Sequence, residues 1–341
     1  MISSTGTKGF VRLEHGAGGL AGWELFSELI LPALDNPALA EQGDAAVVEA
    51  GGLRLAFTTD TFVVSPLFFP GGDAGCLAVN GTVNDLAMCG AQPLCLSAGL
   101  VMEEGLSLDV LERVLSSMGR AARNAGTCVV TGDTKVVQKG AADRLFVNTS
   151  GIGVVAKNAD LSPAGAKPGD RLLVSGPLGE HGAAVLAARE GLEIGGGLSS
   201  DTAALNGLVQ ALLDSACRIH ALRDPTRGGL AAAINEIAWR SGAAVRIFES
   251  AVPVSPAVAG TCEILGIDPL VLASEGRMAM FVHGQDGEKA LEVMKGHALG
   301  RDAAIIGRVE QGPPGRVVLE TAVGGERLLP MPSGHPLPRI C

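Results

Sequence analysis

The sequence predicts an α/β protein of two domains followed by an extended C-terminal tail. The chain has 341 residues, about twice the length of a typical domain. Segments with strand-like and helix-like apolar spacing alternate along it, and we find no internal repeat that would indicate a solenoid or a propeller. Residues 157–170, rich in Pro, Gly, Asn and Asp, are typical of a linker. We therefore expect domains over 1–159 and 160–329 and a tail over 330–341.

The first half predicts two helices among strands. Two apolar runs on either side of Gly51-Gly52 indicate a hairpin over 45–60. Apolar residues at helical spacing predict a helix over 74–89, and a strand over 93–102 follows. Ser107 is placed to cap a second helix, which stops at Gly126. The sequences TCVVTGD (127–133) and RLFVNTSGIGVV (144–155) complete this half as strands.

The second half repeats the alternation. We expect a strand over RLLVSG (171–176), a helix from Gly182, a helix from about Ser200 to Asp214, a helix over 228–242 and strands with a glycine bend over VLASEGRMAMFV (271–282). The tail contains four prolines, which exclude a helix or a central strand. We expect it to be extended and exposed, with a reach of roughly 35 Å at about 3.1 Å per residue.

Composition excludes several classes of function. The net charge is −10, so nucleic acid and anionic membranes are poor partners. No apolar run reaches the ~18 residues of a membrane helix, and charged residues interrupt any signal peptide, which predicts a cytoplasmic protein. Seven cysteines without a CxxC pair argue against a disulfide framework or a zinc ribbon. P-loop and GxSxG motifs are absent, and the GxGxxA at 151–156 lies in a strand-like run without a helix after it.

Isolated aspartates flanked by small residues recur along the chain. Carboxylates beside Gly, Thr and Asn suit Mg²⁺ that bridges a polyphosphate. Each aspartate alone is equally consistent with a turn former or a helix cap. Taken together, the aspartates favour a nucleotide–metal site. The residues are Asp44, Asp60, Asp85, Asp133 and Asp224.

Four further segments carry candidate chemistry. Lys135 is the only base in a Thr-Gly-Asp-Thr-Lys turn, where it either binds a γ-phosphate, acts as an acid or base, or is a surface lysine. Glu275 interrupts an apolar run and is either partnered by Arg277 or catalytic. The glycine-rich segment 15–19 either closes over phosphates or is a mobile lead-in, and His181 in GPLGEHG is the most site-like histidine.

The last residue, Cys341, ends the proline-rich tail. A thiol there is expected to be exposed and movable, whereas most cysteines are buried in cores. The charge of Arg339 favours its thiolate. The alternative is an accidental terminal residue without a role.

These residues resemble a known family. The C-terminal PRIC (338–341) is the most specific element, and GDAAVV (43–48), TTDTFVVSP (58–66), VNGTVNDLAMCGA (79–91), VTGDTKVV (130–137) and DPTRGGLA (224–231) accompany it. The chain is similar over its whole length to the HypE family of hydrogenase maturation proteins, within the PurM-like superfamily of aminoimidazole ribonucleotide synthetase, selenophosphate synthetase and thiamine monophosphate kinase. The resemblance implies a two-domain α/β fold, a homodimer whose N-terminal mixed sheets join, and ATP held between the domains.

The resemblance also implies a reaction. A HypF-type carbamoyltransferase would carbamoylate Cys341, and this protein would use ATP to dehydrate the S-carbamoyl group to an S-cyano (thiocyanate) group. A HypC–HypD-type complex would then receive the cyanide ligand for the iron of a nickel-iron hydrogenase. Lys135 and Mg²⁺ would neutralise phosphate charge, and Glu275 would be the base. The implied metal ligands are Asp44, Asp60, Asp85 and Asp224, and the implied ATP-binding residues are Asn80, Gly132, Asp133, Thr134, Lys135 and Arg227.

Two alternatives to the self-modifying dehydratase stay open. In the first, the chain is a superfamily enzyme that acts on a free small molecule. In the second, it is a non-catalytic scaffold that presents a thiol. The terminal PRIC separates the first reading from the synthetase and kinase relatives, whose chemistry does not require it.

Overall fold

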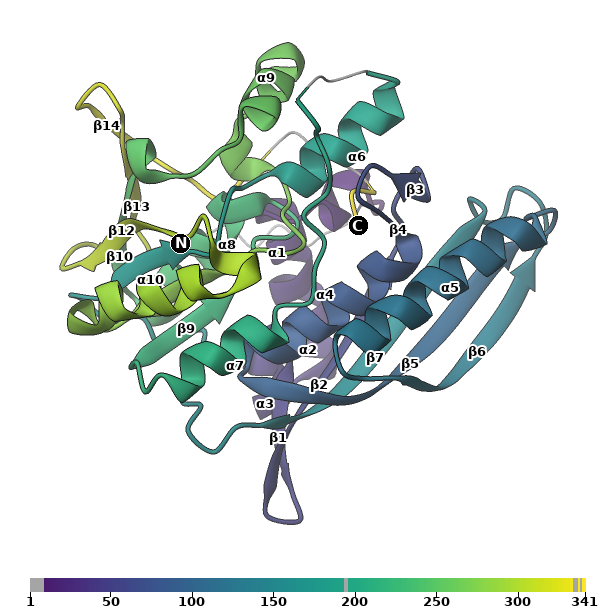
Figure 1. Ribbon diagram of the computed structural model, residues 1–341, viewed down its shortest axis with the longest axis horizontal. Helices are drawn as coiled ribbons and strands as arrows, with labels where there is room; N and C mark the ends of the chain where they lie inside the picture. The colour runs from purple at the N-terminus through teal and green to yellow at the C-terminus, as the bar shows by residue number, and fades with distance from the viewer. Residues whose placement is uncertain (1–8, 193–195, 334–336, 338) are drawn as a thin grey trace.

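The computed structural model describes residues 9–192, 196–333, 337 and 339–341. It is a mixed α/β structure with one large sheet in each half of the chain and a small two-stranded sheet in the first half (Figure 1). The N-terminal sheet has the strand order β1-β2-β7-β5-β6, in which only β5 and β6 are parallel. Its strands are β1 (Ala46–Ala50), β2 (Leu53–Phe62), β5 (Ala91–Glu103), β6 (Val129–Val137) and β7 (Leu145–Val155).

Two helices cover one face of this sheet (Figure 1). Helix α4 (Ala74–Met88) lies directly on β2, β5 and β7, and α5 (Leu108–Asn124) packs beside α4. Gly81 permits the close contact with β2, because a Cβ there would lie 2.7 Å from Phe62 Cζ. The hairpin at Gly51-Gly52, the helix expected over 74–89 and the cap at Ser107, whose hydroxyl accepts from Asp109 N at 3.3 Å, are confirmed.

The C-terminal sheet is buried on both faces. Its strand order is β14-β13-β10-β12-β8-β11-β9. Within β8, Leu173 joins one apolar cluster with Leu208 and Met294, whereas its neighbours Leu172 and Val174 join another with Leu230. This alternation is the period of a strand between two layers. Its strands are β8 (Arg171–Val174), β9 (Ile219–Arg223), β10 (Ala244–Phe248), β11 (Ala279–Val282), β12 (Ala304–Glu310), β13 (Val317–Glu320) and β14 (Glu326–Leu328).

Helices form the outer layers of this half. Helix α8 lies on one face of the sheet, and α7 and α10 lie on the other, where α7 also contacts α4. Helix α6 packs against the N-terminal half, because Ala183, Val185 and Leu186 share a core cluster with Leu77 and Val79 of α4. The long helices here are α6 (Glu180–Glu190), α7 (Asn206–Asp214), α8 (Gly229–Ser241), α9 (Pro256–Leu265) and α10 (Gly287–Gly296).

Short elements complete the described part of the chain. In the first half these are η1 (Leu13–Gly16), α1 (Leu20–Leu25), η2 (Phe26–Ile30), α2 (Leu31–Leu34), α3 (Pro37–Ala40), β3 (Phe68–Phe69) and β4 (Gly72–Asp73). In the second half they are η3 (Glu249–Ala251), η4 (Pro269–Val271), η5 (Gly284–Asp286) and η6 (Ala298–Gly300). No helix among the described residues is both long and apolar enough to cross a membrane.

Three expectations about elements were wrong. The turn expected at 131–135 is instead the middle of β6, because parallel pairing with β5 carries the strand on to Val137. Helix α7 begins at Asn206 and not near Ser200, since residues 200–203 bond to other parts of the molecule. Residues 272–278 form a loop, and only Ala279–Val282 pair as a strand.

Candidate active site

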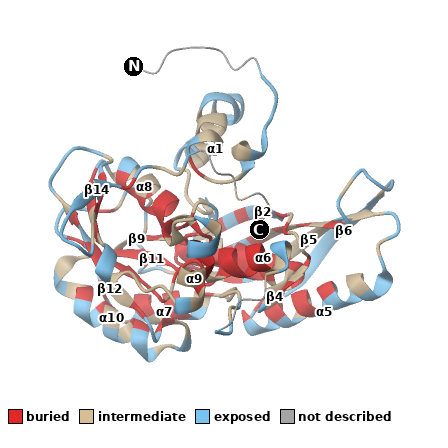
Figure 2. Ribbon diagram, turned by 90° about the horizontal axis from the view of Figure 1, so that it is seen from above, coloured by how far each residue is buried: buried red, intermediate tan, exposed pale blue. Residues whose placement is uncertain are grey.

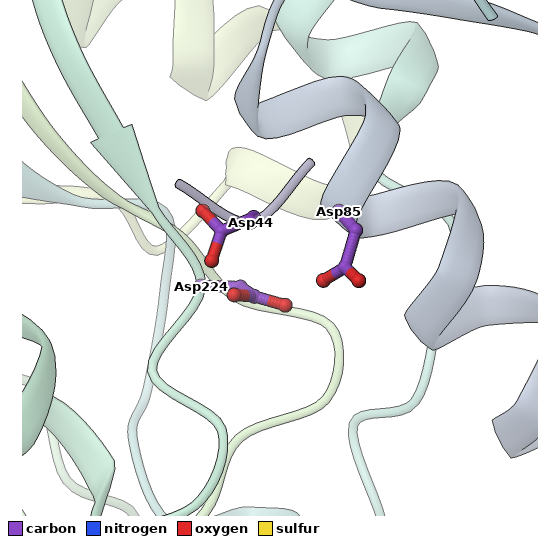
Figure 3. Close-up of side chains that lie close together, drawn as sticks. All are labelled: Asp44, Asp85 and Asp224. Carbon is purple, nitrogen blue, oxygen red and sulfur yellow. The ribbon is translucent and has the colours of Figure 1, made fainter. Parts of the chain in front are cut away.

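Three carboxylates from separate elements meet where the two halves of the chain adjoin. Asp44 precedes β1, Asp85 lies on α4 and Asp224 directly follows β9. One oxygen of each lies within 4.8 Å of the others, and Figure 3 shows the side chains converging on one space. Of the four aspartates expected at a metal, these three come together as a possible ligand group. Asp60, on β2, is outside that group but close enough for its charge to raise the pKa of Asp85.

Burial raises the pKa of all three carboxyl groups, and repulsion within the cluster adds to the rise in Asp85 and Asp224. Burial raises the pKa of Asp44 to about 6, although Arg223 pairs with it at 2.5 Å and opposes the rise. Burial and the charge of Asp44 raise the pKa of Asp224 to about 8. Burial and the charge of Asp224 raise the pKa of Asp85 well above its usual range, while the Thr58 hydroxyl donates to Asp85 at 2.7 Å. Three hard oxygen donors that repel one another are a donor set that fits Mg²⁺.

The C-terminal tail is seated beside this cluster. Val63 N donates to the main-chain oxygen of Cys341 at 3.1 Å, and Ser65 N donates to that of Arg339 at 3.2 Å. Ile340, only 3% exposed, is part of the apolar core cluster that contains Leu77. The expectation of an exposed tail is therefore wrong for its last residues. Apolar burial of Ile340 and the two backbone bonds hold them against the chain that follows β2, and Figure 1 shows the C-terminus near β3, β4 and α6.

Two side chains of α6 hold the carbonyls of the tail. His181 Nε2 lies 2.9 Å from the Ile340 oxygen. Arg189 Nη2 donates to the oxygens of Arg339 and of Ser65, each at 2.7 Å, so it joins the tail to the segment beneath it. The Arg339 side chain turns back to Val63 O at 2.8 Å and also pairs with Asp143.

The seated thiol faces a set of charged groups. Burial, followed by the charge of Glu275, raises the pKa of the Cys341 thiol well above its usual range, and Arg227 opposes this. The effect is reciprocal, because the charge of Cys341 is the largest cause of the raised pKa of Arg227. The charges of Asp60 and Asp224 also act on the thiol. The structure thus brings Cys341, Glu275 and Arg227 together next to the carboxylate cluster.

Glu275 is buried and is not paired with Arg277, the partner considered from the sequence. It is 1% exposed, and its Oε1 has no hydrogen bond in the described part of the chain. Arg277 instead pairs with Glu180 at 3.0 Å and lies 3.6 Å from Asp201. Burial, then the charge of Asp224, raises the pKa of Glu275 well above its usual range. Arg277 is therefore not the partner of Glu275, and the catalytic role of Glu275 stays a prediction.

The Thr-Gly-Asp-Thr-Lys segment lies on an open edge of the N-terminal sheet. Residues 129–136 of β6 are exposed, as Figure 2 shows in pale blue. Lys135 pairs with Asp133 at 2.5 Å, and both side chains are largely exposed. Within one chain, Gly132, Asp133, Thr134 and Lys135 are thus not brought together with Cys341 by any contact among the described residues. Asn80 lies on α4, 7% exposed, and donates to Thr202 at 3.1 Å.

The glycine-rich N-terminal segment packs onto the same region. A Cβ on Gly18 would lie 2.6 Å from the Arg227 backbone, and Leu20 N donates to Pro332 O at 3.0 Å. A cavity of about 580 Å³ lies between this segment and the C-terminal half, lined among others by Trp23, Arg227 and Trp239. The segment is therefore a wall of this cavity and lies against both Arg227 and the tail.

Sequence reasoning missed several residues that shape the site. Arg189, Asp201 and Arg223 were not singled out, and Ser200 was considered only as a helix start. None of them sits in a distinctive local pattern, since their contacts arise between segments far apart in the chain. His181 was noticed for its glycine-rich surroundings, which permit the tight αL turn at Gly179 before α6, but its contact with the tail was not foreseen.

Comparisons with known proteins agree with this architecture. The N-terminal domain of the AIR synthase related proteins matches residues 42–155, and their C-terminal domain matches residues 167–320. The carbamoyl dehydratase HypE of Azotobacter vinelandii is 48% identical over 333 residues, which cover 98% of each chain. A crystal structure of a HypE–HypF complex superposes with a TM-score of 0.86 at 47% identity, covering 90% of this chain and 99% of that one. A crystal structure of HypE in complex with ATP superposes with a TM-score of 0.82 at 48% identity, covering 97% of this chain and 100% of that one.

Proposed function

Because the chain belongs to the HypE family of carbamoyl dehydratases, we propose that it dehydrates an S-carbamoyl group on its own Cys341 to an S-cyano group, using ATP. The product would supply cyanide for the iron of a nickel-iron hydrogenase. One observation carries the proposal beyond the family name: the tail seats the Cys341 thiol beside Glu275, Arg227 and the carboxylate cluster. A thiol at the end of a substrate-like tail, next to a buried carboxyl whose Oε1 has no hydrogen bond among the described residues, is what self-modification requires.

The chemistry follows from the leaving group. An amide oxygen leaves poorly, so direct loss of water is slow. Transfer of the γ-phosphoryl group of ATP to that oxygen, with loss of one proton from nitrogen, gives an imidate phosphate. Cleavage of the carbon–oxygen bond then releases phosphate, and loss of the second proton leaves carbon triply bonded to nitrogen. The sum is ATP and carbamoyl thiol giving ADP, phosphate and thiocyanate, so the water removed from the amide is taken up in phosphate.

Glu275 is the candidate base for those protons. Because its pKa is raised, the Glu275 carboxylate is a stronger base than an ordinary glutamate and accepts a proton more readily. Its Oε1 has no hydrogen bond to give up within the described residues before it accepts one. Arg227 lies near the same thiol and carries a charge suited to the phosphoryl oxygens.

A magnesium ion fits the carboxylate cluster. Asp44, Asp85 and Asp224 would hold it, with Asp60 nearby, and bound Mg²⁺ would offset charge on the phosphates. The protein's own contribution is to keep these carboxylates at one point although they repel one another. Arg223 and Thr58 do this by pairing with Asp44 and Asp85.

The nucleotide-binding role of β6 is proposed together with a homodimer. Strand β6 is an edge strand with exposed apolar side chains, including Val130 and Val136, at 60% and 68% exposure. Such an edge is open to pairing with a second copy. Joining N-terminal sheets would cover the segment that contains Gly132, Asp133, Thr134 and Lys135, where with Asn80 and Arg227 it would bind ATP.

Partners follow from the fate of the tail. We propose a HypF-type carbamoyltransferase that loads Cys341, a HypC–HypD-type complex that accepts the cyano group, and a cytoplasmic site of action. Both exchanges require the thiol to leave its seat, because Ile340 is buried there. The N-terminal domain (1–159) would bind ATP and dimerise, the C-terminal domain (160–329) would close the site, and residues 330–341 would move.

The decisive experiment is the intact mass of the protein carbamoylated at Cys341, before and after addition of Mg-ATP. We expect loss of one water, localised to Cys341 by peptide mapping. Glu275→Ala and Lys135→Ala should block this loss but still accept the carbamoyl group, whereas Lys139→Ala, an exposed lysine just beyond β6, should behave like the wild type. An unchanged mass in the loaded wild-type protein, with ATP bound, would refute the proposed function.

A further inference from the structure

The segment 200–202, between α6 and α7, contacts three parts of the site proposed above. Its backbone is fixed, because Ser200 N donates to Pro70 O at 2.8 Å. The Thr202 hydroxyl accepts from Asn80 of α4 at 3.1 Å. The Ser200 hydroxyl lies 2.8 Å from Nδ1 of His181, whose other ring nitrogen faces the tail, and Asp201 Oδ1 accepts from Glu275 N at 2.9 Å.

Ser200 contacts one ring nitrogen of His181, and the other ring nitrogen contacts the tail. The Ile340 carbonyl can only accept, so the ring nitrogen facing it at 2.9 Å, Nε2, must carry the proton. In a neutral ring Nδ1 is then an acceptor, and the Ser200 hydroxyl, 2.8 Å away, donates to it. Burial lowers the pKa of His181 to about 4, which keeps the ring neutral near pH 7. The Ile340 carbonyl thus sets the tautomer that holds the tail, and Ser200 supplies the donor that this tautomer needs at Nδ1.

Asp201 holds the main chain of Glu275. Its Oδ1 accepts from Glu275 N at 2.9 Å, and Asn84 donates to the Glu275 carbonyl at 3.0 Å. Both main-chain groups of Glu275 are therefore fixed, while its Oε1 is left without a partner among the described residues. The Asp201 side chain is fully buried, and among the described residues its Oδ2 has no hydrogen bond and lies 3.6 Å from Nε of Arg277, so its firm polar contact is the one to Glu275 N.

We propose that Ser200 and Asp201 form one positioning element, in which Ser200 acts through His181 to set the place of the thiol-bearing tail and Asp201 sets Glu275 opposite it. The inference rests on the proposed function. Neither residue touches the reacting atoms, so both are positioning residues. Because they are adjacent in a fixed backbone, the distance between substrate and base depends on two neighbouring side chains.

The test follows loss of water from the carbamoylated full-length protein in a single turnover at saturating Mg-ATP. Ser200→Ala and Asp201→Ala should slow it on the order of 10- to 100-fold, the effect of a misplacement of about 1 Å. When the same rate is measured over a range of ATP concentrations, the apparent KM for ATP should change less than about twofold, because nucleotide binding is not altered. Ser200→Thr keeps a hydroxyl and Asp201→Asn keeps an oxygen acceptor, so both should recover most of the rate.

Asp170→Ala is the matched control. Asp170 is also a buried aspartate that accepts from a backbone amide, that of Lys167 at 2.8 Å, but its other partner is His220. It should leave the rate of water loss unchanged in protein that remains folded. A second readout is the tautomer of His181 by nitrogen-15 NMR, where Ser200→Ala should reduce the Nε2–H form and Asp201→Ala should not.

Several results would overturn the inference. One is a wild-type rate in both alanine variants, and another is an Asp201→Asn variant as slow as Asp201→Ala, which would indicate a role for charge in place of position. If Asp201→Ala does not fold, the rates of Ser200→Ala, Ser200→Thr and Asp201→Asn still test the inference. If the wild type itself fails to lose water, the proposed function fails first, and an unchanged His181 tautomer in Ser200→Ala would refute this inference separately.

Discussion

Removal of the Arg189 guanidinium should release the tail. In Arg189→Ala, the bond from Nη2 to the Arg339 oxygen at 2.7 Å is lost, and this bond joins the tail to α6. Arg189 also donates to Ser65 O at 3.0 and 2.7 Å. These two bonds do not involve the tail, but they hold the segment on which the tail lies. The perturbation therefore acts on the balance between a seated and a released tail.

The magnitude follows from the kind of bond. A hydrogen bond from a charged donor contributes about 1.5–3 kcal/mol. Its loss should lower the ratio of seated to released tail about 10- to 150-fold, at about 1.4 kcal/mol for each factor of ten. Where alkylation takes place from the released state, the labelling rate of Cys341 should rise by the same factor, until the released tail predominates.

Alkylation with iodoacetamide, followed by peptide mass mapping, measures this rate. In the wild type we expect slow labelling, because the Cys341 thiol is half-buried and its pKa is raised. Cys128 is exposed and serves as an internal reference in the same sample. Arg54→Ala is the matched control, since Arg54 also donates to a main-chain oxygen, that of Ala159 at 2.8 Å, far from the tail.

Two results would refute the reasoning. The first is a ratio of Cys341 to Cys128 labelling that Arg189→Ala leaves within about twofold of the wild type, which is below the smallest effect of a charged hydrogen bond. The second is an equal rise in Arg54→Ala, which would indicate general loosening of the fold.

Three more predictions address stability, the metal and assembly. The pKa of His181 is about 4 in the folded protein, below its ordinary value of 6.5. Between pH 6.5 and 4 the unfolded chain therefore binds more protons than the folded one. The free energy of unfolding should fall by up to about 3 kcal/mol as the pH drops through this range. Urea titrations should show this decline reduced in His181→Gln, and an identical pH dependence in both proteins would contradict it. Asp85→Asn removes one of the three carboxyl groups that meet in the cluster, so it should reduce the rise in melting temperature that Mg²⁺ produces at pH 8. An undiminished Mg²⁺ effect would count against the proposed ligand set. Val130→Asp places a charge on the open edge of β6 and should give monomers by light scattering, whereas an intact dimer would exclude that edge as the interface.

Elements with strong local signals could be predicted from the sequence. Gly51-Gly52 marks a hairpin because both residues adopt positive φ, and the Ser107 hydroxyl caps α5 through a bond two residues away. Helix α8 ends where Gly242 takes a left-handed conformation, as expected. In each case the determining interaction lies within a few residues of the signal, so neighbouring sequence contains the needed information.

The rest depended on distant contacts. Gly132-Asp133 has the composition of a turn, yet pairing with Ala98 and Gly99 of β5 extends it as a strand. The prolines of the tail predict an extended chain but not where it lies, which is decided by Ile340 burial and by α6. The aspartate set was recognisable because its members share a residue type and small neighbours. Asp201 had no such companions, and its relation to Glu275 exists only in the folded chain.

Gly81 limits how this protein can be engineered. Replacement of a glycine inside a helix by alanine commonly strengthens the helix by about 0.5–1 kcal/mol. Here the added methyl group would meet the Phe62 ring at 2.7 Å and force α4 away from β2. Asp85 stands one turn further along α4, so the same shift would move its carboxylate from Asp44 and Asp224. A thermostability library should therefore keep position 81 fixed, since a gain in helix strength would be accompanied by displacement of the Asp85 carboxylate from the cluster.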